Sequence, residues 1–273
     1  MIPVLETAPT ARLEARFSHC DGKTRMRDCL ANAPLKIAKT FELEKGVSVC
    51  VMDSSPGLLA GDFYEFGWHL EPGACVAIST QGFTRVHPSR ENPCRLNQRI
   101  RLETGAVLQW FPEPLMLYRD AALQTETEIE LGENSMLAMG EIVCAGRVGR
   151  GEAFEFHAYQ SRLRVRRDGR LIFVSQTALR PSQFEPKRVG AWGKYTHQGQ
   201  FLLFMPRINP ELLDEVRAVL AENPAVWSGA SQLESGDIAV SMLGRRAFDL
   251  QALMAQLRCI SNCHSEGVLA TEE

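Results

Sequence analysis

Residues 54–62, SSPGLLAGD, have the glycine, serine and acidic residues of a ligand-binding loop. A phosphate-binding loop ends in Lys-Ser or Lys-Thr, because the lysine reaches the β- and γ-phosphates and the hydroxyl binds Mg²⁺. This stretch has neither ending. It also does not match G-x-G-x-x-G before a helix, since the following FYEFGWHL alternates like a strand. It is therefore predicted to form two turns, in which Asp62 either accepts backbone hydrogen bonds or takes part in ion handling.

The histidines and cysteines do not show the spacing of a metal site. No H-x-x-x-H or H-E-x-x-H pattern occurs among the six histidines. Cys259, Cys263 and His264 come nearest to a thiolate cluster, but structural zinc takes four ligands at short spacings. We therefore expect no stable metal site and keep these three residues only as weak candidates. His87 and His197 lie in polar stretches and either bind a borderline metal or are ordinary hydrogen-bonded histidines.

The carboxylates do not show a catalytic arrangement either. No nucleophile elbow G-x-S-x-G occurs. Glu141, Glu152 and Glu155 could supply an acid and a base, but no close pair with a positioned third group is readable. Glu141 with Arg147 could form the carboxylate–cation cluster of a β-solenoid carbohydrate-active enzyme, which is the alternative function. The prediction is that the protein is not an enzyme.

An internal repeat indicates how these residues are positioned. Four segments align without gaps, at 43–53, 70–80, 102–112 and 131–141, and 166–176 is a looser fifth copy. Each has a strand end, a turn with glycine or asparagine, and a second strand. The segments begin 27, 32, 29 and 35 residues apart. Recurrence at such intervals favours stacked β-coils, a β-helix-like body. The alternative is an ordinary β-sandwich with similar hairpins.

The repeat also predicts a shared face. If the coils stack, equivalent positions line up from one coil to the next. The last aligned position holds Asp53, Thr80, Pro112 and Glu141, and the least regular segments of the chain follow directly after it. We therefore expect one rim of the molecule to collect the loops that carry function.

The C-terminal part contains two helical patterns. Apolar residues recur at helical spacing over about 210–222 and again over about 250–262. The predicted class is thus mainly β: a strand-rich region over residues 1–205 with two appended α-helices. The tail, 263–273, has little to bury and is expected to be disordered. We expect one domain over 1–273, with the helices covering an open edge or end of the β body.

Composition excludes some partners. The net charge is −3 with a pI near 6.1, and no long basic run occurs, so nucleic acid is not an expected partner. No stretch approaches the roughly 18 apolar residues of a membrane span. The first residues do not read as a secretory signal. With eight dispersed cysteines, these features predict a cytoplasmic protein with reduced thiols and no membrane partner.

Four short motifs occur in order between residues 34 and 157. They are PGLLAGD at 56–62, TQGFTR at 80–85, FPEPL at 111–115 and GRVGRGE at 146–152. In this order they resemble the urease accessory protein UreD family, called UreH in some organisms. Tyr-Thr-His at 195–197 matches the UreH-type branch. The chain departs from many relatives in having a single glycine after Pro56.

The resemblance implies a β-helix-like protein with two helices and a non-enzymatic role. Family members bind apo-urease and form a complex with UreF and the GTPase UreG, which inserts nickel into the urease active site. UreD bridges the GTPase and the enzyme, and an internal passage through UreD is the family's proposed nickel route. The implied cargo is transient nickel, with no tightly bound cofactor. Whether the chain is a dimer within the complex stays open.

A passage needs oxygen and imidazole groups that bind the ion weakly enough to release it. From their clustering at the repeat ends, the candidates are Asp53, Asp62, Glu113, Glu141 and His87. The late helices and the segment 180–194 are the candidates for contacting UreF. The residues singled out for partner contact are Arg180, Lys187, Tyr195 and His197.

Overall fold

The computed structural model describes residues 8–44, 46–183, 185–186, 188, 190–206 and 210–263. One sheet contains β1 (Ala11–Cys20), β2 (Lys23–Ala31), β5 (Phe63–Leu70), β8 (Cys94–Leu102), β11 (Ala122–Leu131), β13 (Ala158–Arg167) and β14 (Arg170–Leu179). The other contains β3 (Leu35–Leu43), β4 (Gly46–Asp53), β6 (Cys75–Thr80), β7 (Thr84–Val86), β9 (Val107–Phe111), β10 (Leu115–Leu117), β12 (Met136–Cys144), β15 (His197–Phe204), β16 (Trp227–Gln232) and β17 (Ile238–Gly244). The helices are α1 (Pro210–Glu222), α2 (Ala247–Cys263) and the short 3-10 helix η1 (Val148–Arg150).

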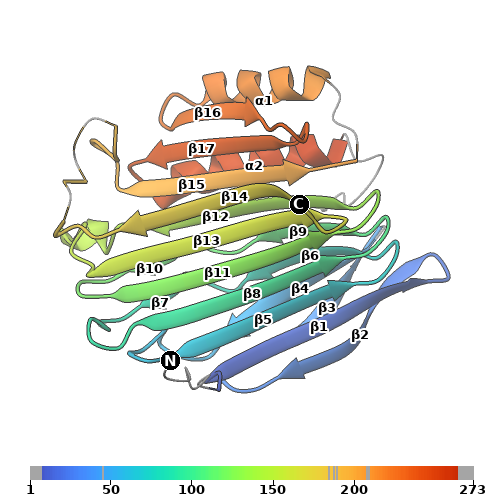
Figure 1. Cartoon of the computed structure of the whole chain (residues 1–273), viewed down its shortest axis with the longest axis horizontal. Helices are drawn as coiled ribbons and strands as arrows, with labels where there is room; N and C mark the ends of the chain where they lie inside the picture. The colour runs from blue at the N-terminus through green and yellow to red at the C-terminus, as the bar shows by residue number, and fades with distance from the viewer. Residues whose placement is uncertain are drawn as a thin grey trace.

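The two sheets face each other, and both α-helices cover the outside of one of them (Figure 1). The seven-stranded sheet has the order β14-β13-β11-β8-β5-β1-β2. The ten-stranded sheet has the order β16-β17-β15-β12-β9-β6-β4-β3, with β7 and β10 beside this path. The protein is therefore mainly β with two helices, as the sequence predicts.

Successive coils form because the chain crosses repeatedly from one sheet to the other. β5, β8 and β11 lie parallel in the seven-stranded sheet and continue through tight turns into β6, β9 and β12, which lie parallel in the ten-stranded sheet. These turns hold Gly73, Gly105 and Asn134 at φ of 70°, 65° and 55°. Glycine and asparagine are the residues that adopt this conformation most readily. The predicted stacked β-coils are confirmed.

The predicted register holds for three of the five copies. β6 pairs with β9 and β9 with β12 at the offsets of 32 and 29 residues that the alignment gives. β4 is displaced by two residues, because Val51 rather than Asp53 is the partner of Thr80. An even displacement keeps the same side chains on the core side. The fifth copy is not a coil, since β13 and β14 form an antiparallel hairpin within one sheet.

Two hydrophobic clusters hold the layers together. One fills the space between the sheets and includes Trp68, Ile78 and Leu108. The other lies between the ten-stranded sheet and the helices. The close approach of α2 depends on glycine, since a Cβ at Gly244 would lie 2.1 Å from a methyl carbon of Leu250.

The region after residue 205 differs from the expectation. Two further strands, β16 and β17, lie between the helices and extend the ten-stranded sheet beyond β15. The strand WSGASQ has small residues instead of an apolar alternation, so its sequence does not signal a strand. α2 begins at Ala247, ahead of the expected start, and ends at Cys263. The rest of the expected tail lies outside the described residues.

Candidate functional site

The irregular segments after β4, β6, β9 and β12 lie together on one side of the molecule, at the left in Figure 1. A third, short parallel ladder joins them: β7 pairs with β10, β10 with β12, and Leu58 bridges to Val86. Gly57 is required where this ladder begins, because its φ is 128° and a Cβ there would lie 2.4 Å from the Arg85 carbonyl oxygen. Backbone pairing thus orders this side of the molecule, which we call the rim.

Two carboxylates of the rim stabilise its turns. Asp62 Oδ2 accepts a hydrogen bond from the Leu59 backbone N–H at 2.8 Å. Asp53 Oδ1 accepts one from the Ser55 backbone N–H at 2.8 Å. The stretch SSPGLLAGD is therefore a pair of turns, and Asp62 has the structural one of its two suggested roles. A role for Asp62 in ion handling stays a prediction.

Two cavities lie between the sheets behind the rim. The outer cavity, of about 340 Å³, has Asp53, Ser55 and Tyr64 in its wall. The inner cavity, of about 100 Å³, has Glu113 and Glu141 in its wall. The residues common to both walls are Phe66, Thr80, Thr84 and Leu96. The two cavities therefore adjoin at these four side chains.

Glu141, on β12, is the most unusual group of the inner cavity. Its carboxylate makes no hydrogen bond or ion pair with any other described residue. Burial raises the pKa of Glu141 to about 6, because the ionised form loses hydration without gaining a partner. Its side chain remains partly accessible because it faces the cavity.

Glu113 links the inner cavity to α2. Its Oε2 accepts a hydrogen bond from Gln251 Nε2 at 2.9 Å, and its backbone N–H donates to Thr80 Oγ1 at 2.8 Å. Asp53 thus belongs to the wall of the outer cavity, and Glu113 and Glu141 both belong to the wall of the inner one.

The inner cavity also has buried N–H groups in its wall. Gln98 Nε2 and Trp110 Nε1 are buried and have no hydrogen-bond partner within the described part of the chain. Water satisfies such groups in polar cavities, and a cavity of about 100 Å³ has room for a few water molecules.

Two of the predicted passage residues lie outside the cavity walls. Asp62 is in the turn described above. His87 Nε2 donates to the Pro56 carbonyl oxygen at 3.1 Å, and its ring packs edge-on against Tyr118 with 5.1 Å between the centroids. The structure therefore brings Asp53, Glu113 and Glu141 to the cavities and leaves Asp62 and His87 in the rim.

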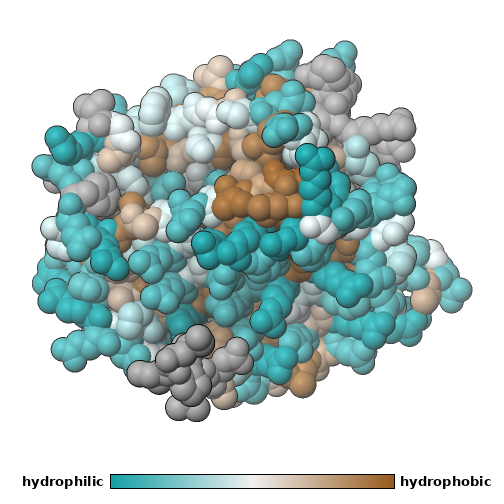
Figure 2. Space-filling view, in the orientation of Figure 1, coloured by the Kyte–Doolittle hydropathy of each residue, from teal (hydrophilic) through white to brown (hydrophobic). Residues whose placement is uncertain are grey.

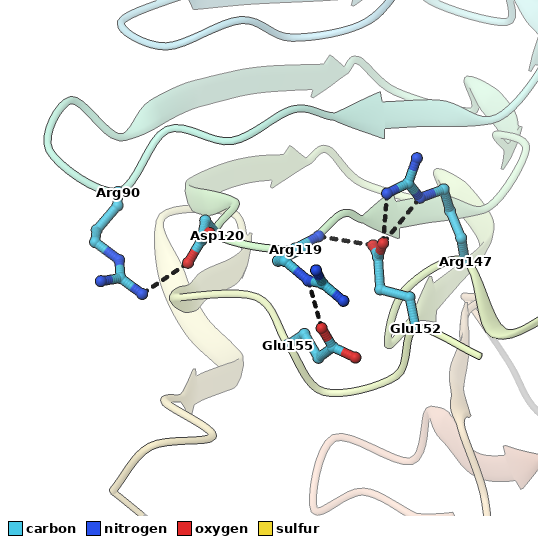
Figure 3. A network of polar contacts seen from close by, with 6 residues as sticks. All are labelled: Arg90, Arg119, Asp120, Arg147, Glu152 and Glu155. Carbon is cyan, nitrogen blue, oxygen red and sulfur yellow. Dashed lines mark hydrogen bonds and ion pairs between the residues drawn. The ribbon is translucent and has the colours of Figure 1, made fainter. Parts of the chain in front are cut away.

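Figure 3 shows a network of ion pairs that fastens the rim loops together. Its members are Arg90, Arg119, Asp120, Arg147, Glu152 and Glu155. Glu152 is 5% exposed and accepts hydrogen bonds from the Arg119 backbone N–H at 2.7 Å and from Arg147 Nε at 3.0 Å. Burial alone would raise the pKa of Glu152, but these hydrogen bonds outweigh burial and lower it.

The predicted partner-contact residues fall in different environments. Arg180 is exposed just after β14. Tyr195 stacks on Trp227, with the rings 3° from parallel and 6.5 Å between the centroids. His197 is buried, its Nδ1 lies 3.0 Å from Thr196 Oγ1, and desolvation lowers its pKa. Lys187 lies outside the described residues, and the contact roles stay predictions.

The structure describes two of the three weak metal candidates. Cys259 and Cys263 are exposed on the last turns of α2, while His264 lies outside the described residues. In the described ranges, no group of three or more histidine, cysteine, aspartate or glutamate side chains could hold a metal ion. None of the described helices is long and apolar enough to span a membrane.

Sequence reasoning missed the polar side chains that face inward from the seven-stranded sheet. Gln98 and Thr127 are buried and belong to the wall of the inner cavity. A signal was present, because Gln98 occupies an apolar position in the alternation Cys94, Leu96, Gln98, Ile100. A polar residue at an inward position of a strand needs a hydrogen-bond partner inside the β body, so this break in the apolar alternation marks the position as unusual.

Comparison with known proteins relates this architecture to one family. The family model of the UreD urease accessory protein matches residues 9–268. The chain belongs to the UreD family. A urease accessory protein UreD of Acetivibrio thermocellus is 31% identical over 252 residues, covering 92% of this chain and 96% of its own length.

Two further relatives support the same assignment. A UreD of Actinobacillus pleuropneumoniae serotype 3 is 31% identical over 245 residues, with 86% of this chain and 91% of its own length covered. A urease accessory protein UreH of Helicobacter hepaticus is 28% identical over 195 residues, with 71% and 77% covered. The predicted resemblance to the UreD family is thus confirmed.

Proposed function

We propose that this UreD-family chain serves urease maturation in the cytoplasm as a non-enzymatic scaffold. In this role it bridges apo-urease to UreF and the GTPase UreG, and nickel passes through it as cargo on the way to the urease active site. The observation that carries the proposal is the pair of adjoining cavities with Asp53, Glu113 and Glu141 along them. The name shared by the relatives, urease accessory protein, supports the biological setting.

The carboxylates along the cavities have the chemistry of a conduit. Thiolate and imidazole clusters hold Ni²⁺ tightly, whereas isolated oxygen ligands release it. Glu141 lacks a partner among the described residues, so an arriving cation would relieve the cost of its burial. The small inner cavity would make the ion exchange part of its water shell for the carboxylate.

The alternative of a carbohydrate-active enzyme has less support. It combined Glu141 and Arg147 in one cluster, but the Arg147 guanidinium binds Glu152 in the rim. Glu141 lines a cavity of about 100 Å³. Small-molecule sites usually enclose about 300–1,000 Å³.

The test is nickel loading of urease co-expressed with its accessory proteins. Glu141→Gln removes the charge while keeping the shape, and we expect a several-fold lower nickel content of urease with the accessory complex still formed. Glu42→Gln, on the exposed face of β3, is the control for loss of one charge. Full nickel loading in the triple variant Asp53→Asn, Glu113→Gln, Glu141→Gln would refute the passage.

A further inference from the structure

The two sheets end at different points, and the described residues leave part of one inner face uncovered. The seven-stranded sheet ends at β14, while the ten-stranded sheet continues through β15, β17 and β16 (Figure 1). A groove of about 710 Å³ lies at this step. It is lined mainly by residues 176–179 of β14, 227–231 of β16 and 241–243 of β17. We call it the β14 groove.

The floor of the β14 groove is formed by the inner face of β16 and β17, where the described strands of the other sheet do not extend. Trp227 pairs with Leu243 and Gly229 with Ser241, so these residues share the inner face of β16 and β17. Trp227 is 63% exposed. The small residues Gly229 and Ser241 leave room for another backbone above them.

The wall of the groove is an open strand edge. β14 is the last strand of its sheet, and its described backbone groups are paired only with β13. Beyond the groove, towards the start of the same strand, Leu171 and Val174 are 48% and 49% exposed. Figure 2 shows a hydrophobic area where β14 and β15 lie in Figure 1, above a largely hydrophilic surface. An unpaired apolar edge is a template for one more strand.

We propose that the β14 groove binds an extended segment of a partner protein, which adds to β14 as an eighth strand of the seven-stranded sheet. The segment carries apolar side chains flanked by acidic ones. Strand addition of this kind takes affinity from backbone hydrogen bonds and specificity from the pockets under alternate side chains. The proposal rests on the proposed function in one respect, because the partner is sought in the urease maturation complex.

Charge at the two ends of β14 determines the chemistry of the partner. β14 contains no acidic residue. Arg170 and Arg180 at its ends are exposed, and neither makes an ion pair with another described residue. Acidic residues flanking the incoming apolar segment would complement both arginines.

The same charges disfavour a second copy of this chain. Antiparallel pairing of the whole β14 with itself, centred on Ser175, would bring Arg170 opposite Arg180 of the other copy. Like charges directly opposite each other destabilise a strand pair. The last described residue of the chain, Cys263, ends α2 on the other face of the ten-stranded sheet. A partner segment is therefore the better occupant.

Backbone hydrogen exchange tests the proposal directly. The isolated chain is compared with the chain assembled with UreF, UreG and apo-urease. We expect the β14 amides that point away from β13 to exchange at least tenfold more slowly in the assembly. Protection of these outward amides already present in the isolated monomer would overturn the proposal in favour of the chain's own segment. Protection that rises with concentration of the chain alone would overturn it in favour of a second copy.

A variant that fills the groove with a large side chain provides a second test of the proposal. Ser241→Trp puts a large side chain on an exposed position in the groove, and we expect at least tenfold weaker assembly with an unchanged melting temperature. Ala38→Trp on β3, exposed near the opposite end of the same sheet, is the control and should assemble normally. Unchanged assembly of Ser241→Trp together with unprotected β14 amides would refute the proposal. An assembly that protects β14 but delivers no nickel would refute only the proposed passage.

Discussion

Glu141 and Glu152 are both withdrawn from bulk water, yet their surroundings are opposite. Glu152 accepts hydrogen bonds from Arg147 and from the Arg119 backbone, and its pKa is lowered despite its burial. Glu141 has no such partner among the described residues, and burial raises its pKa to about 6. A buried carboxylate that is paired, such as Glu152, fixes a loop. An unpaired one destabilises the fold and remains available to a cation.

The largest expected loss of stability comes from substituting Glu152. Glu152→Ala removes the acceptor for Arg147 and Arg119, and we expect the free energy of unfolding to fall by about 2–3 kcal/mol, since hydrogen bonds to charged groups contribute ~1.5–3 kcal/mol. Urea denaturation at pH 7 measures the change. Because the folded pKa is lowered, this stabilisation is present above the unfolded pKa and is lost as the pH falls through the folded pKa.

Glu155 provides the matched control for Glu152. It pairs with the Arg119 side chain in the same network, but Glu155 is 37% exposed and the arginine 61%. Exposed pairs of this kind contribute little to stability. Glu155→Ala should therefore leave the denaturation midpoint almost unchanged. Equal effects of the two substitutions would show that burial of Glu152 does not matter.

The next largest expected effect is a gain in stability, and it comes from substituting Glu141. Glu141→Gln removes an ionised group with a pKa raised to about 6, so the free energy of unfolding at pH 7 should rise by about 1–2 kcal/mol, at ~1.36 kcal/mol per pKa unit. In the same variant the nickel content of urease should fall. A variant that is more stable and less active separates a functional carboxylate from a structural one.

The pH dependence sharpens this prediction. The folded pKa of Glu141 lies above its unfolded value, so the penalty of ionising it is present above about pH 6 and disappears as the pH falls below the unfolded pKa. The stability gain of Glu141→Gln should therefore shrink between pH 7 and pH 4, as measured by denaturation at each pH. A gain that is constant with pH would show that the carboxylate is not desolvated.

The sequence predicted the stacked coils because each turn requires a specific residue. Positive φ at Gly73, Gly105 and Asn134 leaves a local signature that repeats along the chain. It did not predict β16, because a strand of small and polar residues depends on its neighbours in the sheet for stability. β17 was also missed, although Ile238, Val240 and Met242 alternate along it as buried apolar residues.

The site was predicted only in part, for a related reason. Asp53, Glu113 and Glu141 follow from the repeat, since a coil end marks the rim. The adjoining cavities could not be predicted, because they depend on how Phe66, Thr80 and Leu96 of separate coils leave space between the sheets. Whether His87 and Asp62 face that space is decided by the rim ladder, which no local pattern reveals.

Apart from the Glu155 control, the smallest expected effect is at Asp62, where a turn acid and a passage residue give different results. Asp62→Ala loses the acceptor for the Leu59 N–H, and we expect the free energy of unfolding to fall by about 1 kcal/mol, the usual contribution of one such hydrogen bond. Asp62→Asn keeps an acceptor and should recover most of that loss in denaturation experiments. Because Asp62 lies outside the cavity walls, nickel loading per folded complex should be normal in both variants. Reduced loading in Asp62→Asn, with stability restored, would show that the charge of Asp62 acts on the ion, and would extend the passage from the cavities into the rim.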